Sequence, residues 1–61
     1  MNEHLRLAFG YRQKAVELRA MSTDFKDTWT HRTMEKLAAS YDSLAIDEEN
    51  LAKEDESAGR L

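Results

Sequence analysis

The chain has 61 residues, of which 34% are charged and 41% hydrophobic, with no cysteine and a formal net charge of −3. This composition excludes a disordered or disulfide-stabilised chain, and one small domain over residues 1–61 is expected. Because so short a chain buries little apolar surface, we expect it to gain stability by associating with another chain. It has no apolar run of about 18 residues and no signal-peptide pattern, which predicts a cytoplasmic protein without a membrane partner.

The charges are distributed unevenly along the chain. Residues 1–36 contain seven Lys and Arg against five Asp and Glu, whereas residues 37–61 contain two against seven. A mildly basic first half and an acidic second half are typical of two antiparallel helices that attract each other. The same distribution disfavours nucleic-acid binding as the function, since a nucleic-acid binder gathers basic residues on one exposed surface.

Residues 2–21 are predicted to form a first helix, because they lack proline and their apolar residues recur at helical spacing. When each residue is stepped by about 100°, the apolar side chains divide into two groups on different sides of the helix. The group expected to pack inside a helical hairpin contains Ala8, Tyr11, Ala15 and Leu18. The group expected to bind a second subunit or another protein contains Leu5, Phe9, Val16 and Ala20.

Residues 22–27 are predicted to form a turn, because their serine, threonine and aspartate side chains compete for backbone hydrogen bonds. Phe25 is expected to fold back into the hairpin core. Asp27 or Thr28 is expected to cap the second helix. Trp29, in the first turn of that helix, is expected to close the hairpin by packing, and the alternative is that it forms an exposed anchor for a partner.

Residues 28–56 are predicted to form a second, longer helix, in which the pair Leu-Ala returns every seven residues. This spacing places the pairs on one stripe of an α-helix, because seven residues make nearly two turns. The positions expected in the hairpin core are Met34, Leu37, Tyr41 and Leu44. The positions expected to meet a second subunit are Ala38, Ala45, Leu51 and Ala52.

The two predicted helices fold back on each other into an all-α, antiparallel hairpin. In the expected register Tyr11 lies opposite Tyr41, and the first helix ceases to cover the second near Leu51. A second apolar side and an overhang together predict a homodimer, in the form of an antiparallel four-helix bundle. The alternatives are a hairpin that docks on a different protein and one continuous helix in a coiled coil, which the turn residues disfavour.

Two patterns stand out in these helices, YRxKAxELR at residues 11–19 and, after Asp27 and Arg32, LAxxYxxLA at residues 37–45. Together they resemble a group of short, uncharacterised bacterial helical-hairpin proteins. The resemblance implies a small, all-helical bacterial protein, and it implies no activity.

Two sets of polar residues are candidates for a functional role. Glu48 falls within the apolar stripe of the second helix, and the expected register brings it close to His4. Such a contact would raise the histidine pKa and respond to pH, and the alternative is two solvated side chains at the open end of the hairpin. Arg12 and Arg19 are expected to form ion pairs with the second helix of the same or another subunit, and the alternative is that they bind phosphate. Their candidate partners are Asp42, Asp47 and Glu49.

The sequence contains no cysteine, no Glu-x-x-His motif and no glycine-rich phosphate loop, so no catalytic residue, metal or cofactor is predicted. The expected function is therefore non-enzymatic, that of a small structural or interaction protein that self-associates. The alternative is an adaptor or regulator that docks through Leu5, Phe9 and Val16 or through its acidic C-terminal residues. Nucleic-acid regulation ranks third, because Tyr11 and Tyr41 lie on core positions where they cannot stack on bases.

Overall fold

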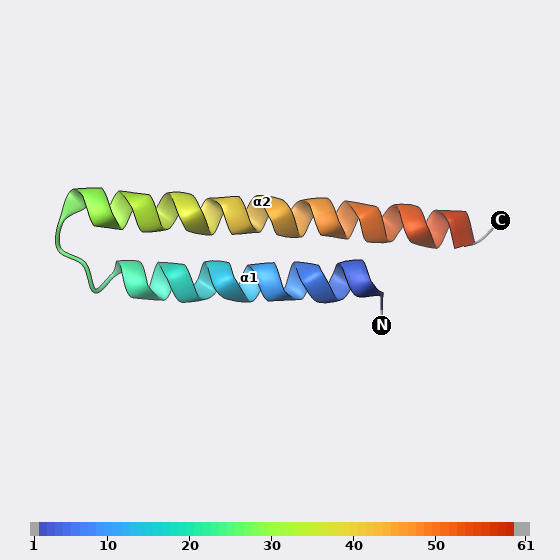
Figure 1. Ribbon diagram of the computed structural model, residues 1–61, viewed down its shortest axis with the longest axis horizontal. Helices are drawn as coiled ribbons and strands as arrows, with labels where there is room; N and C mark the ends of the chain where they lie inside the picture. Colours follow the sequence, from blue (N-terminus) through green and yellow to red (C-terminus); the bar gives the residue numbers. More distant parts are fainter. Residues whose placement is uncertain (1, 60–61) are drawn as a thin grey trace.

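The structure is a computed structural model that describes residues 2–59, with side chains described from residue 2 to residue 57. It is an antiparallel hairpin of two helices, α1 (Glu3–Ser22) and α2 (Thr28–Gly59), which lie side by side over the whole length of α1 (Figure 1). The all-α hairpin predicted from the sequence is therefore confirmed. The second helix continues three residues beyond its predicted end at residue 56.

Side-chain caps begin both helices. Asn2 Oδ1 accepts a hydrogen bond from the backbone N–H of His4 at 2.7 Å. Asp27 Oδ2 accepts one from the backbone N–H of Thr30, also at 2.7 Å. Each carboxylate or amide oxygen satisfies a backbone donor that the first turn of a helix leaves without a partner. Of the two predicted caps for the second helix, Asp27 is the one observed.

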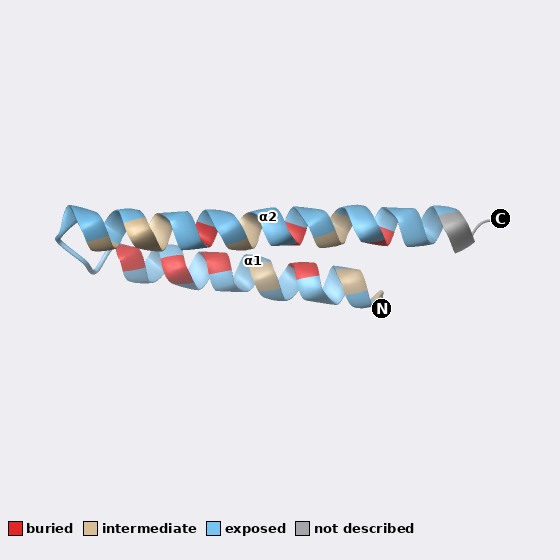
Figure 2. Ribbon diagram, turned by 45° about the horizontal axis from the view of Figure 1, so that its top comes forward, coloured by how far each residue is buried: buried red, intermediate tan, exposed pale blue. Residues whose placement is uncertain are grey.

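The two helices meet through alanines. The buried residues, drawn red in Figure 2, lie along the sides of α1 and α2 that face each other. The hydrophobic residues buried between them are Ala8, Ala15, Leu18, Ala38, Ala45 and Ala52. The prediction that the three alanines of α2 meet a second subunit is therefore wrong, since all three lie inside the hairpin. The physical reason is that a methyl group allows two helix backbones to approach closely, so the alanines occupy the line of closest approach.

The leucines of the same repeat are displaced to the edge of this line. Leu37 and Leu44, predicted in the hairpin core, are 46% and 43% exposed, and Leu51 is 42% exposed. Each leucine precedes an alanine by one residue, which rotates it by about 100° around the helix. A helix that presents its alanines to α1 must therefore turn its leucines outward.

The predicted register is present at the middle of the hairpin. The rings of Tyr11 and Tyr41 lie with their centroids 6.1 Å apart. Met34 and Tyr41 are half-buried against the cluster formed by Ala15, Leu18 and Ala38.

Polar contacts, rather than aromatic packing, hold the closed end of the hairpin together. The Ser22 side chain is fully buried, and its Oγ donates to Glu35 Oε1 at 2.9 Å. The Ser22 carbonyl oxygen lies 3.1 Å from His31 Nδ1. The predictions that Phe25 and Trp29 pack here are wrong, since Phe25 is 44% and Trp29 76% exposed. With the two backbones held close by these contacts, a large ring does not fit between them.

The hairpin is a single layer of two helices. Its Cα atoms extend over 53 × 16 × 9 Å. The accessible surface is 4727 Å², whereas a compact folded monomer of 7.1 kDa would expose roughly 4,100 Å². The chain therefore exposes more surface than a compact monomer of its mass, because it lacks a second layer to enclose a core.

The alanine interface can be tested by enlarging one of its members. Replacing Ala45 by Leu should lower the free energy of unfolding by about 1–3 kcal/mol, because the larger side chain forces two closely packed backbones apart. Urea unfolding followed by circular dichroism measures this change. Ala39→Leu is the matched control, since Ala39 is exposed on the same helix and the change there should stay within about 0.5 kcal/mol. Equal effects at the two positions would contradict the alanine interface.

Candidate functional site

One face of the hairpin is crossed by ion pairs, and we call it the arginine face. The Arg12 guanidinium donates to both carboxylate oxygens of Glu49 at 3.0 and 2.7 Å. Arg19 donates to Asp42 at 2.7 Å and lies 3.7 Å from Glu35. The predicted pairing of Arg12 and Arg19 with the second helix is therefore confirmed, with Glu49 and Asp42 as the partners among the predicted candidates.

These contacts shift the titration of the groups involved. The hydrogen bond from Arg12 holds the pKa of the Glu49 carboxyl below its usual value. The hydrogen bonds to Glu49 and Asp42 raise the pKa of Arg12 and of Arg19 respectively. All four side chains are partly open to water, where ion pairs contribute little stability. Their effect is to fix which sides of α1 and α2 lie on the same face.

Apolar residues of α1 flank the arginine face on its outer side. Leu5, Phe9, Val16 and Ala20, the predicted partner group, are all exposed, and Phe9 and Val16 are 62% and 61% exposed. Because the alanines predicted to join them are buried in the hairpin, the predicted partner face does not form one continuous surface.

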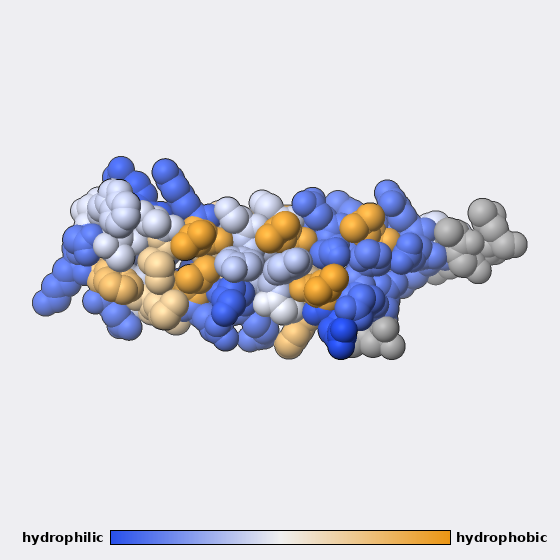
Figure 3. Space-filling view, viewed as in Figure 1, coloured by the Kyte–Doolittle hydropathy of each residue, from blue (hydrophilic) through white to orange (hydrophobic). Residues whose placement is uncertain are grey.

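The opposite face carries apolar side chains from both helices, and we call it the leucine face. Stepping outward from the alanines, away from the arginines, leads on each helix to a row of large apolar residues. Figure 3 shows these rows as orange patches along both α1 and α2 on one side of the molecule. The residues of the leucine face are Leu7, Leu18 and Met21 on α1 and Leu37, Leu44 and Leu51 on α2. This face was not predicted from the sequence, because Leu37 and Leu44 were expected in the hairpin core and Leu51 was grouped with the alanines expected to meet a second subunit.

Two charged residues interrupt the leucine face. Lys14 lies on α1 with its Nζ 3.6 Å from Glu17 Oε2. Glu48 lies on α2 between the last two leucines of the row. Its side chain is only 14% exposed, because His4 covers it.

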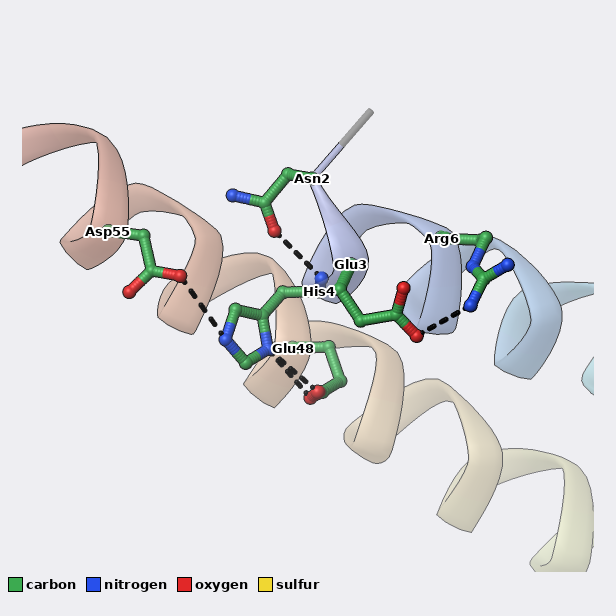
Figure 4. A network of polar contacts seen from close by, with 6 residues as sticks. All are labelled: Asn2, Glu3, His4, Arg6, Glu48 and Asp55. Carbon is green, nitrogen blue, oxygen red and sulfur yellow. Dashed lines mark hydrogen bonds and ion pairs between the residues drawn. The ribbon is translucent and has the colours of Figure 1, made fainter. Parts of the chain in front are cut away.

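The open end of the hairpin holds a cluster around His4 (Figure 4). His4 Nδ1 lies 3.1 Å from Glu48 Oε1, and His4 Nε2 lies 3.3 Å from Asp55 Oδ2. One imidazole therefore bridges two carboxylates that are seven residues apart on α2. The structure brings together the two residues of the predicted polar pair and adds Asp55, which the sequence analysis did not include.

This arrangement favours the charged imidazolium. The hydrogen bond with Glu48 is the largest cause of the raised pKa of His4, loss of hydration lowers that pKa, and the charges of Glu48, Asp55 and Glu3 raise it. When His4 is protonated, both ring nitrogens donate, so the cation compensates the Glu48 carboxylate that interrupts the leucine face. The cluster can therefore couple protonation to the joining of α1 and α2.

The described residues carry few other features of an active or binding site. Over residues 2–57, no group of three or more His, Cys, Asp or Glu side chains is placed to hold a metal ion, and this part of the chain encloses no pocket. Within the same range, neither helix is long and apolar enough to cross a membrane.

Comparisons of the chain with family models, with curated proteins and with solved structures give no match. The resemblance to short bacterial hairpin proteins therefore stays a prediction. The exposed apolar faces and the His4 cluster are the features from which a function has to be argued.

The His4 cluster predicts that stability depends on pH. Because the folded-state pKa of His4 is raised above its unfolded value of about 6.5, the folded chain binds more protons. The contribution of His4 to the free energy of unfolding is complete below the unfolded pKa and is lost as the pH rises through the folded pKa. The free energy of unfolding, measured in urea, should fall as the pH rises from the unfolded value of about 6.5 through the folded pKa of His4.

His4→Gln should flatten this dependence, because it removes the titrating group. Glu48→Gln should reduce it, because it removes the largest cause of the raised pKa while the imidazole remains. A His4→Gln variant that loses stability with rising pH as steeply as the unmodified chain would show that another group is responsible.

Proposed function

We propose that this chain is a small, non-enzymatic interaction module whose first partner is a second copy of itself. The leucine face of one hairpin docks on the leucine face of another, and the two layers form a four-helix bundle. Association of this kind encloses a core that one hairpin does not have. The chain then acts by assembly and binding rather than by chemistry.

The observation that supports this proposal is that the small apolar residues are buried between the helices while the large ones are exposed. Among the residues whose side chains the structure describes, five of the six buried hydrophobic ones are alanines, while each leucine of the α2 row is more than two-fifths exposed. Burial stabilises a chain roughly in proportion to the apolar area removed from water, so an alanine interface contributes less than a leucine interface. The side chains that would contribute most are the ones that the hairpin leaves outside.

The dimensions of the hairpin suit such an interface. A layer of 53 × 16 Å between Cα atoms offers a face of the order of 800 Å², which is the area that each partner buries in a typical stable interface. Because the same apolar rows are present on both copies, a two-fold axis can bring them together as one self-complementary surface.

The leucine face is a better docking surface for a second copy than the arginine face. It carries a row of three leucines on α2 and large apolar side chains on α1, so that a partner covers both helices together, whereas Ile46 is the large apolar residue of α2 beside the arginine face. On the arginine face, the Arg12–Glu49 and Arg19–Asp42 pairs lie between the two helices. Docking there would remove these charges from water, which costs free energy.

The remaining expectations are part of the same proposal. A bacterial, cytoplasmic location and the resemblance to short hairpin proteins agree with a small assembly module. An adaptor that binds another protein through Phe9 and Val16 is the alternative, because these two side chains are the most exposed of the large apolar residues of α1. In that case substitutions on the side of the arginine face, rather than on the leucine face, would weaken the binding of the partner.

Sedimentation equilibrium at micromolar concentration tests the proposal. The unmodified chain should have a mass of about 14 kDa, twice the chain mass of 7.1 kDa. Leu44→Glu should reduce this to the monomer mass, because it places a charge at the centre of the leucine face. Val16→Glu is the matched control on the opposite side of the hairpin, and it should leave the dimer intact.

Either of two results would contradict the proposal. One is an unmodified chain that sediments as a monomer at these concentrations. The other is a dimer that dissociates with Val16→Glu but not with Leu44→Glu, which would place the interface on the arginine face.

A further inference from the structure

The two ends of the hairpin differ in charge. The half next to the loop, residues 12–41, contains six Lys and Arg against four Asp and Glu. The open half, residues 2–11 and 42–59, contains two Lys and Arg against eight Asp and Glu. The hairpin is therefore acidic at its open end and mildly basic at its loop end, and this difference depends on the fold, since each half combines residues from both helices.

At the open end of the hairpin, the last residues of α2 are not covered by α1. His4, in the first turn of α1, contacts Glu48 and Asp55. The first helix therefore begins opposite the part of α2 that lies midway between these two residues. The residues of α2 from about 53 to Gly59 extend beyond α1 by roughly 10 Å at 1.5 Å per residue. Leu51 lies at the border of this overhang, and Phe25 and Trp29 are exposed at the other end of the molecule.

The leucine row of α2 is symmetric about its central member. Leu37 and Leu51 each lie seven residues from Leu44, and Leu44 lies at the middle of the helix that runs from Thr28 to Gly59. If two α2 helices cross this face antiparallel, Leu44 meets the partner's Leu44 and Leu51 meets the partner's Leu37. Every leucine of the row then has a leucine opposite, as an interface with two-fold symmetry requires.

We propose that two copies dock through their leucine faces with the hairpin loops at opposite ends, α2 antiparallel to α2, about a two-fold axis at Leu44. This arrangement rests on the proposed function and specifies its partner geometry. It places the acidic open end of each copy on the basic loop end of the other. It also places the overhang of α2 across the part of the partner that carries Leu18 and Met21.

The other arrangement that is compatible with two-fold symmetry has both loops at the same end, with α1 facing the partner's α2. It brings two acidic open ends together, and like charges at an interface disfavour a wrong arrangement. It also leaves both overhangs of α2 side by side and uncovered. The charge distribution and the lengths of the two helices thus favour the same arrangement.

Distances between spin labels on two copies test this proposal. The chain has no cysteine, so Lys26→Cys in the exposed turn accepts one nitroxide label per copy. With the loops at opposite ends, the two labels lie on either side of the axis at Leu44 and should be about 50 Å apart, given 1.5 Å per residue. With the loops at the same end, they should be separated by little more than two helix diameters, roughly 20 Å.

A label at Asn50→Cys is the matched control. Asn50 is exposed and lies only six residues from Leu44, so the two arrangements give similar separations, roughly 27 Å with the loops at opposite ends and roughly 20 Å with the loops at the same end. Pulsed electron–electron double resonance should detect one distance for the Lys26→Cys label and one for the Asn50→Cys label. Adding Leu44→Glu should abolish both distances.

The outcomes separate the two proposals. A Lys26 distance near 20 Å together with the Asn50 distance would overturn the antiparallel arrangement while leaving self-association in place. If neither label gives a distance and the labelled chain sediments as a monomer, self-association itself is wrong. A Lys26 distance near 50 Å that persists in the Leu44→Glu variant would place the interface on a different face and would also overturn the proposal.

Discussion

The close approach of two helix backbones along a line of alanines is the constraint on which the rest of this structure depends. Ala38, Ala45 and Ala52 fill the position on α2 that faces α1. Because a leucine precedes each of them, the same packing that joins the helices turns a row of leucines outward. The hairpin is thus a single layer that does not enclose a core, and its large apolar side chains are available to pack against a second layer.

The polar residues divide the surface of this layer. Arg12 and Arg19 join the helices through acidic partners on one face. Removing these charges from water would cost free energy, so that face is disfavoured as an interface. His4 performs a related role at the open end, where it compensates Glu48 within the otherwise apolar row. The leucine face is left as the surface on which another chain can dock, and the unequal charges of the two ends give that docking a direction.

The sequence was sufficient to predict the two helices, the turn, the Tyr11–Tyr41 register and the proximity of His4 to Glu48, because these follow from helical periodicity and from one fold-back. It was not sufficient to predict which member of each Leu-Ala pair faces α1. Leucine and alanine are neighbours on the helix surface, and the rotation of α2 is decided by how closely the two backbones pack. Trp29 was misplaced for a related reason, since the buried hydrogen bond of Ser22 to Glu35 occupies the closed end. The periodicity does not reveal such a contact.

In the proposed dimer, the stability of the hairpin depends on covering the leucine face with a second copy. The most direct measurement is the thermal unfolding midpoint at about 1 µM and about 100 µM chain, followed by circular dichroism, since binding between folded copies makes the midpoint depend on concentration. Self-association predicts a midpoint that rises by several degrees over this range. A midpoint that is the same at both concentrations would contradict it.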